Sequence, residues 1–414
     1  MLNWRKTMNP KLLFLIPILL LTVACAPPSL EPAAFSPADP PPTELVIVQP
    51  NGTAGELIAY NTNTSREHFR LPAGFLTADE SLYYAAAQQR GRTRLNLYNL
   101  QTGSIAHDFT VDGEWNLDGI STNGRWLVLT RIPNEQEQTR RQANGIWQTE
   151  IQIFDTQNGR TTHTITLDGN YEIDAISGDG TGLFLIQHLP PANPDHYLIR
   201  AYDLSLDELL PDPLRDKRFL DELMVGYPWG SISDPAGVWY LTLYLNTQHN
   251  KAFIHALNME NRWTFCIDLP SGEGDFNTLQ QYTLTLAPGG HKIYAANAAL
   301  GVVAEVNLQE VMVTRQRQFP AHPLTARFRG DSGLNASLLT ADGNTLYFTD
   351  GRQLWAYNTM TGDVSEPLLE SGNSSVQALA LSADGESLYI AQARRPLLVL
   401  STTTTSLNTT MLQD

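Results

Sequence analysis

"LALSADGESLYIAQ", residues 379–392, contains two apolar runs on either side of a turn formed by Asp384 and Gly385. Two such runs joined by a short Asp-Gly turn are typical of a β-hairpin. Close variants of this stretch recur along the chain: "GFLTADESLYYAAA" (74–87), "DGISTNGRWLVLTR" (118–131), "DAISGDGTGLFLIQ" (174–187), "LTLAPGGHKIYAAN" (284–297) and "LLTADGNTLYFTD" (338–350). The sequence therefore predicts a protein built from repeated hairpins.

Each repeat continues with a third strand that ends in another turn, followed by a polar fourth strand. Examples of the third strand are "LIRAYDLSLD" (198–207), "FIHALNMEN" (253–261) and "QLWAYNTMTG" (353–362). Units of four strands that repeat every roughly 40 to 56 residues are typical of the blades of a β-propeller. The predicted fold class is therefore all-β, a propeller of four-stranded antiparallel blades over residues 45–414.

The number of blades stays open between seven and eight. Eight units begin, near residues 45, 75, 117, 173, 228, 282, 335 and 377. The first unit lacks an inner strand before "LVIVQ" (45–49), and the C-terminus is expected to supply that strand. The last unit, however, uses all four of its strands in its own blade. Seven blades with one irregular unit, or eight with one three-stranded blade, therefore both fit the sequence. The only helix expected is at "DELLPDPLRDKRFLDEL" (207–223), whose mixed charges suit a solvated insertion.

The N-terminus has the features of a targeting segment. Basic residues precede the apolar run of residues 12–24, which is too short for a comfortable membrane span of about 20 residues. "TVAC" (22–25) resembles the lipobox of bacterial lipoproteins, which implies cleavage before Cys25 and acylation, including palmitate, at that cysteine. An ordinary secretory signal is the alternative. We expect a signal peptide at 1–24 and a lipidated cysteine with a proline-rich tether at 25–44.

This resemblance places the protein outside the cytoplasm, anchored by lipid to the cell membrane or outer envelope. The net charge is −16, and without the three basic residues of the signal peptide 24 basic residues stand against 43 acidic ones. Such an acidic body is poorly suited to nucleic acid, which is bound through clustered Lys and Arg. Cys266 is the only other cysteine, and we expect it to be a small buried strand residue.

The repeats resemble those of known propeller families. "HKIYAANAALGVVAEVNL" (291–308) resembles the YVTN-type repeat of bacterial surface and periplasmic propellers, and "IQIFDTQNGR" (151–160) is similar to WD40-related blades. The resemblance implies a fold and no particular activity, because such propellers include scaffolds, receptors, lactonases and quinoproteins. No catalytic residue, metal ligand or cofactor is predicted from these motifs.

Three aromatic residues share one position in successive repeats. "DGEWNLDGIS" (112–121), "DGNYEIDAIS" (168–177) and "MVGYPWGSIS" (224–233) align without gaps. The alignment makes Trp115, Tyr171 and Tyr227 equivalent, and it also makes Asp118 and Asp174 equivalent. Aromatic faces above carboxylates at a channel mouth would suit a sugar or a cation, so these five residues are candidate ligand-binding residues. The alternative is packing between blades, with aspartates that cap turns.

Arginines gather in the loops between second and third strands. Guanidinium groups pair with carboxylate or phosphate through two parallel hydrogen bonds, so a basic rim could recruit an anionic glycan or an acidic partner. The alternative is that they are simply solvated. The candidate rim residues are Arg90, Arg92, Arg140, Arg141, Arg394 and Arg395.

Two functions follow from these observations. The favoured one is a lipid-anchored binding or scaffold module that holds a protein partner or a glycan at its crossover-loop face. The alternative is a lactonase-like propeller hydrolase with an acidic site at the channel mouth, aided by a divalent ion. The absence of a recognisable catalytic motif favours binding over catalysis.

Overall fold

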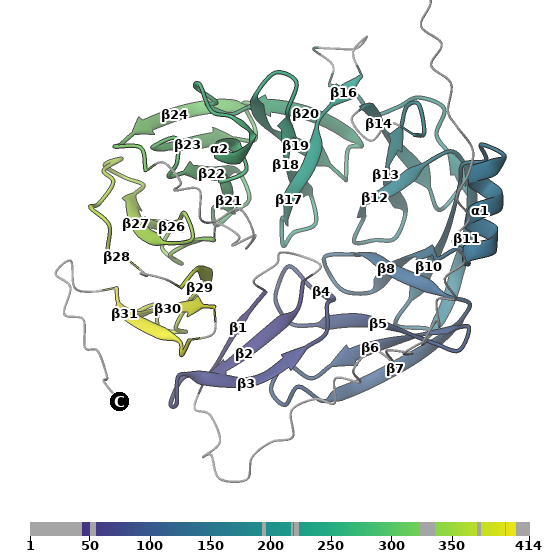
Figure 1. Cartoon of the computed structure of the whole chain (residues 1–414), viewed down its shortest axis with the longest axis horizontal. Coiled ribbons are helices and arrows are strands. Elements are labelled where there is room, and N and C mark those ends of the chain that lie inside the picture. The colour runs from purple at the N-terminus through teal and green to yellow at the C-terminus, as the bar shows by residue number, and fades with distance from the viewer. Residues whose placement is uncertain are drawn as a thin grey trace, which may run out of the picture.

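The structure is a computed structural model that describes residues 44–49, 55–192, 196–216, 218, 223–322, 336–370, 374–393 and 395–402. The predicted signal peptide, Cys25 and all of the tether before residue 44 lie outside these residues, as does Arg394. In the described part, eight antiparallel sheets stand around a common axis (Figure 1). The chain is an all-β propeller, as the repeats predict, and it has eight blades, the number that the sequence left open between seven and eight.

Blades 1 to 4 come from the first half of the chain. Blade 1 contains β1 (Leu45–Val48), β2 (Leu57–Asn61) and β3 (Arg66–Leu71), and blade 2 contains β4 (Phe75–Leu76), β5 (Tyr83–Gln89), β6 (Arg92–Tyr98) and β7 (Ile105–Asp112). Blade 3 contains β8 (Trp115–Ile120), β9 (Trp126–Arg131), β10 (Gln148–Asp155) and β11 (Arg160–Asp168). Blade 4 contains β12 (Tyr171–Ile176), β13 (Gly182–His188) and β14 (His196–Asp203), with β15 (Glu208–Leu209) and β16 (Met224–Val225) beside β14.

Blades 5 to 8 follow in the same order. Blade 5 contains β17 (Tyr227–Ser233), β18 (Trp239–Asn246), β19 (Lys251–Asn258) and β20 (Trp263–Asp268), and blade 6 contains β21 (Thr283–Leu286), β22 (Lys292–Asn297), β23 (Val302–Asn307) and β24 (Met312–Gln318). Blade 7 contains β25 (Ser337–Leu339), β26 (Thr345–Thr349), β27 (Gln353–Asn358) and β28 (Leu369–Glu370). Blade 8 contains β29 (Val376–Leu381), β30 (Ser387–Gln392) and β31 (Leu398–Ser401).

The recurring turn has a local cause that is visible in blade 8. The carboxylate of Asp384 accepts hydrogen bonds from the hydroxyl of Ser382 and from the backbone N–H of Glu386, at 2.5 and 2.9 Å. Gly385 adopts a φ of 73°, a left-handed conformation that glycine takes without steric cost. The same side-chain bonds form around Asp342 and Asp179, so one short motif sets the hairpin of several blades.

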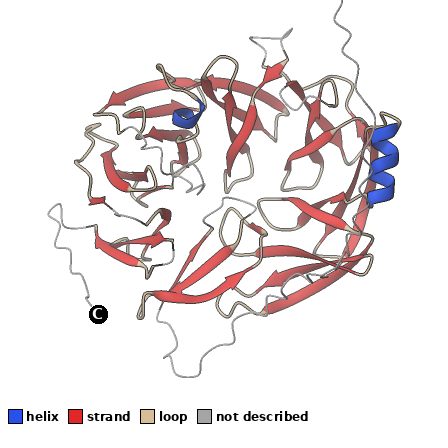
Figure 2. Cartoon of the chain, viewed as in Figure 1, coloured by secondary structure: helices blue, strands red, loops and turns tan. Residues whose placement is uncertain are grey.

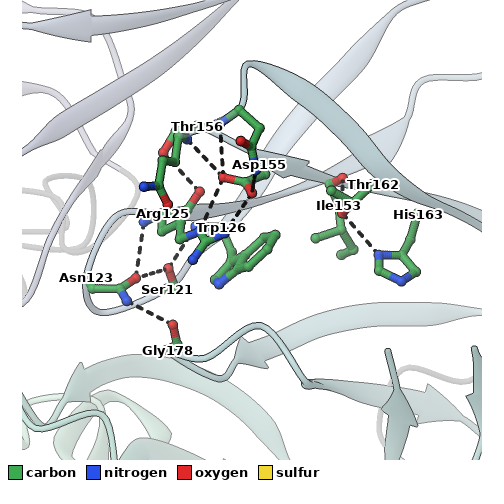
Figure 3. Close-up of polar contacts among 12 residues, drawn as sticks. Ser121, Asn123, Arg125, Trp126, Ile153, Asp155, Thr156, Thr162, His163 and Gly178 are labelled. Carbon is green, nitrogen blue, oxygen red and sulfur yellow. Dashed lines mark hydrogen bonds and ion pairs between the residues drawn. The ribbon is translucent and has the colours of Figure 1, made fainter. Parts of the chain in front are cut away.

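Neighbouring blades are also joined at their hairpin turns, as at the junction of blades 3 and 4. The side-chain amide of Asn123 donates a hydrogen bond of 2.8 Å to the backbone oxygen of Gly178 in the next blade (Figure 3). Beside it, Arg125 lies over the ring of Trp126 and forms an ion pair of 3.0 Å with the buried Asp155. The bond of Asn123 therefore links the two blades on the face opposite the crossovers, and the ion pair of Arg125 holds the turn of blade 3 against its own third strand.

The ring closes between blades 1 and 8 without a shared strand among the described residues. The "LVIV" segment is itself the inner strand β1, and both end blades contain three consecutive strands. The expectation that the C-terminus supplies an inner strand to blade 1 was therefore wrong. The carboxylate of Glu44 instead accepts hydrogen bonds from Tyr389 and from the backbone of Ala383, both at 3.1 Å, and Leu397 donates a backbone bond of 2.7 Å to Ser65.

The described residues contain two helices, and both lie elsewhere than expected. In place of a helix at 207–223, the described residues form β15, and Leu214 bridges to Ile199 at the edge of blade 4. Pro211 and Pro213 explain this, because proline removes a backbone donor and clashes inside a helix. The helices are α1 (Glu135–Ala143), in the loop between β9 and β10, and α2 (Phe276–Leu279), before β21; Figure 2 shows α1 at the outer edge of the ring.

Candidate functional site

A pocket lies between blades 3 and 4 on the crossover face, and its volume is about 470 Å³. It is formed by the inner strands β8 and β12, by β9 and β10, and by the loop that contains α1. Its lining residues are Asp118, Thr130, Arg131, Pro133, Arg141, Gln148, Thr149, Glu150, Tyr171, Glu172 and Ile173. We name this site the interblade pocket.

The outer wall of the interblade pocket is a network of ion pairs. Arg131 contacts Glu150 at 2.7 Å and Glu137 at 3.2 Å, while Arg141 contacts Glu137 at 2.5 Å and Glu150 at 2.6 Å. Burial alone would raise the pKa of Glu150, but hydrogen bonds from the two arginines outweigh it and lower that pKa. The network ties α1 to the ends of β9 and β10, so this wall is preorganised.

The inner wall presents two carboxylates, from Asp118 and Glu172. Asp118 lies at a β-bulge of β8, where one extra residue is inserted opposite β9. The bulge places its carboxylate within reach of the hydroxyl of Thr130, which donates a short hydrogen bond to it. Glu172 is exposed on β12, and its Oε1 lies 3.1 Å from Nε2 of the buried His188.

The aromatic residues predicted to form a platform do not share one exposed surface. Trp115 is 5% exposed and packs in the apolar cluster between blades 2 and 3, and Tyr171 is 6% exposed and packs in the cluster between blades 3 and 4, whereas Tyr227 is half-buried. For Trp115 and Tyr171 this is the alternative, packing between blades. Trp115 also donates its indole N–H to the backbone oxygen of Asp112 at 2.8 Å. The burial of Trp115 and Tyr171 corrects the expectation of three exposed stacking faces, because the first residue of these inner strands faces the core. Tyr171 still contributes to the lining of the interblade pocket.

The two equivalent aspartates have different environments. Asp118 lines the interblade pocket, but Asp174, at the bulge of β12, is buried between blades 4 and 5. The Oδ2 atom of Asp174 is 3.9 Å from Nε2 of His255, which is fully buried on β19. Burial raises the pKa of Asp174 to about 7 and lowers that of His255 to about 4. Sequence reasoning missed His255, whose only signal is a polar side chain inside the apolar run "FIHAL" (253–257).

Trp229 is an exposed aromatic residue that the sequence alignment overlooked. It occupies the bulge of β17, is 39% exposed, and contacts Phe276 edge-to-face at 5.7 Å between ring centres. The gap-free alignment selected Tyr227 because it could not show that the bulge in β17 falls one position earlier than those in β8 and β12.

The candidate arginine rim is dispersed over separate blades. Arg90, Arg92, Arg140 and Arg395 are exposed, and Arg92 pairs with Asp112 at 3.1 Å. Arg141 differs from them because it is half-buried in the wall of the interblade pocket. Among the described residues of the candidate rim, Arg141 therefore lines the interblade pocket.

The described residues also contain a cysteine thiol and acidic and histidine side chains outside the interblade pocket. Cys266 is partly buried, and burial raises the pKa of its thiol to about 12. Within the described ranges, no three His, Cys, Asp or Glu side chains are grouped so that they could hold a metal ion. None of the helices described is both long enough and apolar enough to cross a membrane.

Comparisons with known proteins bear on the fold. The chain matches no protein-family model, and its sequence matches none of the curated proteins. The structure of dihydro-heme d1 dehydrogenase NirN in complex with DHE is similar over 89% of this chain and 73% of that one, with a TM-score of 0.51 and 12% identity. The Dos1 propeller (85% and 88% covered, TM-score 0.49, 10% identity) and the Myceliophteria thermophila Cps50 (Swd1) β-propeller domain (87% and 100%, 0.44, 11%) are also similar. At such low identity, the likeness to the NirN structure shows a shared propeller fold and nothing about activity.

Proposed function

We propose that this chain is a lipid-anchored, extracytoplasmic propeller that serves as a binding module, and that it binds a glycan in the interblade pocket. The interblade pocket is the observation that carries the proposal. Its volume of about 470 Å³ is in the range typical of small-molecule sites. This favours a sugar-sized ligand rather than a partner protein that binds through a flat surface. A partner protein that inserts one side chain is the alternative occupant.

The composition of the interblade pocket also supports a glycan. Carboxylates, hydroxyls and an amide line it, from Asp118, Glu172, Thr130, Thr149 and Gln148. These groups exchange hydrogen bonds with sugar hydroxyls, and they stand on strands of adjoining blades whose positions are fixed. A rigid site loses little conformational entropy when a ligand binds. No observation on the described residues favours the lactonase-like hydrolase, which stays a prediction from the sequence.

A steric block of the interblade pocket tests this proposal. Pro133 is half-buried in the wall, and Pro133→Trp would fill the pocket without a change in charge. Pro235→Trp is the matched control, because Pro235 is exposed in the hairpin turn between β17 and β18. We expect wild type and the Pro235 variant to bind members of a glycan panel that contains neutral, acidic and amino sugars, and we expect the Pro133 variant to lose that binding. Equal binding by both variants would show that the ligand does not use this pocket.

A further inference from the structure

The charges of the interblade pocket are satisfied on one side only. On the side of α1, the guanidinium groups of Arg131 and Arg141 each contact both Glu137 and Glu150, at distances from 2.5 to 3.2 Å. Arg141 also donates to the backbone oxygen of Gln148 at 3.0 Å. Two cations balance two anions in this wall, so the arginines are already engaged by the protein itself.

On the inner side, two carboxylates lack such a balance. Within the described ranges, neither Asp118 nor Glu172 forms an ion pair with Lys or Arg; their polar contacts are the hydroxyl of Thr130 and the ring of His188. The pKa of Asp118 is raised, and the largest cause is burial, which removes water from the carboxyl group. The negative charge of Glu172 also raises this pKa, whereas the hydrogen bond from Thr130 lowers it. Burial, which is the largest of these causes, and the charge of Glu172 both disfavour the ionised form of Asp118, and a cation beside the two carboxylates would offset both effects.

We infer that the interblade pocket binds its ligand through a positively charged amine or guanidinium group placed between Asp118 and Glu172. This inference rests on the proposed function, since it names the ligand class of the same pocket. A protonated amine offers three N–H donors and a full charge, and both carboxylates accept charge-assisted hydrogen bonds. The amine of an amino sugar and the side chain of a lysine or arginine share this chemistry.

Ligands of other charge fit the interblade pocket less well. An anionic group would meet Asp118 and Glu172 on one side, and on the other it would have to displace Glu137 and Glu150 from the two arginines. A neutral hydroxyl could donate to one carboxylate but would leave the repulsion between the two in place. The balance of charge in this pocket therefore argues against the anionic ligand expected from an arginine rim.

Two matched pairs of probes test the charge of the ligand. The first pair is a glucosamine tetramer with free amines and its N-acetylated form, and the second is trilysine and the same peptide with acetylated side chains. Binding would be measured by calorimetry at about pH 6 and low ionic strength, where the amines are protonated and screening is weak. The variants are Asp118→Asn with Glu172→Gln, which keeps the shape and removes both charges, and Glu260→Gln, an exposed control in the hairpin between β19 and β20.

We expect the free-amine form of at least one pair to bind wild type about tenfold more tightly than its acetylated form, as partly screened ion pairs allow. The double variant should bind both forms equally, and the Glu260 variant should behave as wild type. Preference for the tetramer assigns the amine to a glycan, and preference for trilysine assigns it to a protein partner. If the acetylated tetramer binds as tightly as the free amine, the inference is refuted while glycan binding stands. If no probe binds wild type, the inference is refuted, and the wider glycan panel decides on the proposed function alone.

Discussion

The buried pair of Asp174 and His255 makes a specific prediction about stability and pH. The two side chains are 3% and 0% exposed, and the distance of 3.9 Å between Oδ2 of Asp174 and Nε2 of His255 is too long for a direct hydrogen bond. Burial disfavours both charged forms, so the folded protein holds a neutral acid beside a neutral imidazole at about pH 5.5. The unfolded chain at this pH holds an ionised aspartate and a protonated histidine instead.

The pKa shifts of Asp174 and His255 change the free energy of unfolding with pH in opposite directions. The pKa of Asp174 is raised on folding, to about 7, so its stabilising contribution is present below the unfolded pKa and is lost as the pH rises to 7. The pKa of His255 is lowered on folding, to about 4, so its contribution is present above the unfolded pKa and is lost as the pH falls to 4. Between about pH 4 and 6.5 both states bind one proton at this pair, and the two slopes cancel.

Replacement of one residue of the pair should reveal how the pKa shift of the other makes the free energy of unfolding depend on pH. His255→Gln leaves Asp174, and the free energy of unfolding should fall by about 1.4 kcal/mol per pH unit from pH 4.5 to 6.5 relative to wild type. Asp174→Asn leaves His255, and the free energy should fall by about the same amount per unit as the pH drops from 6.5 to 4.5. Urea unfolding at several pH values measures both, and the difference from wild type removes the contributions of other titrating groups.

The double variant is the control, because its difference from wild type should be nearly independent of pH. The titratable groups that face the pair are Tyr197, Tyr240, Tyr244 and Asp216. Burial raises the pKa of each of the three tyrosines, so they stay neutral throughout the window. Parallel pH profiles for the two single variants, or slopes of the same sign, would refute the reasoning.

Three further predictions concern other parts of the chain. Cys25→Ser should release the protein from the membrane fraction, and retention of the variant to the same extent would contradict lipidation. Glu44→Ala removes the acceptor for Tyr389 and for a backbone N–H and should lower the free energy of unfolding by about 1 to 2 kcal/mol, measured in urea. Gly385→Ala places a side chain at a φ of 73° and should lower it by about 1 kcal/mol, whereas Ala383→Gly in the same turn is the control.

The fold was predictable because its determinants are local. Several hairpins depend on a turn such as that from Ser382 to Glu386, whose bonds form within five residues. The start of β12 or β29 follows directly from the spacing of such turns. The helix α1 was missed because its sequence has neither apolar periodicity nor a position in the repeat. Its N-terminal end is instead set by Asn134, whose side chain accepts a hydrogen bond from the backbone N–H of Glu137.

The candidate site was only partly predictable because it depends on contacts between distant residues. Asp118 was found from its position in the repeat, but Glu172 and Glu150 became relevant only when blade 4 was placed against blade 3. The bulges in β8, β12 and β17 decide which side chains face a pocket and which face the core, and a one-residue shift exchanges the two faces. No composition or spacing rule marks where such an insertion occurs.

Among the described residues, the ring closes through side-chain contacts and a backbone bond rather than through a shared strand, and this has a mechanical consequence. The chain enters the propeller at Glu44, whose carboxylate holds blade 8, so tension that arrives through the preceding residues acts directly on the seam between blades 1 and 8. A strand shared between the chain ends would have to be sheared along a whole ladder of backbone bonds before the ring opened. Here a pull needs to break only a few bonds, those of Glu44 and of Ser65 with Leu397, together with the apolar contacts beneath them. If the proposed lipid anchor holds the chain at its N-terminal side, this seam is the element that would yield first under force.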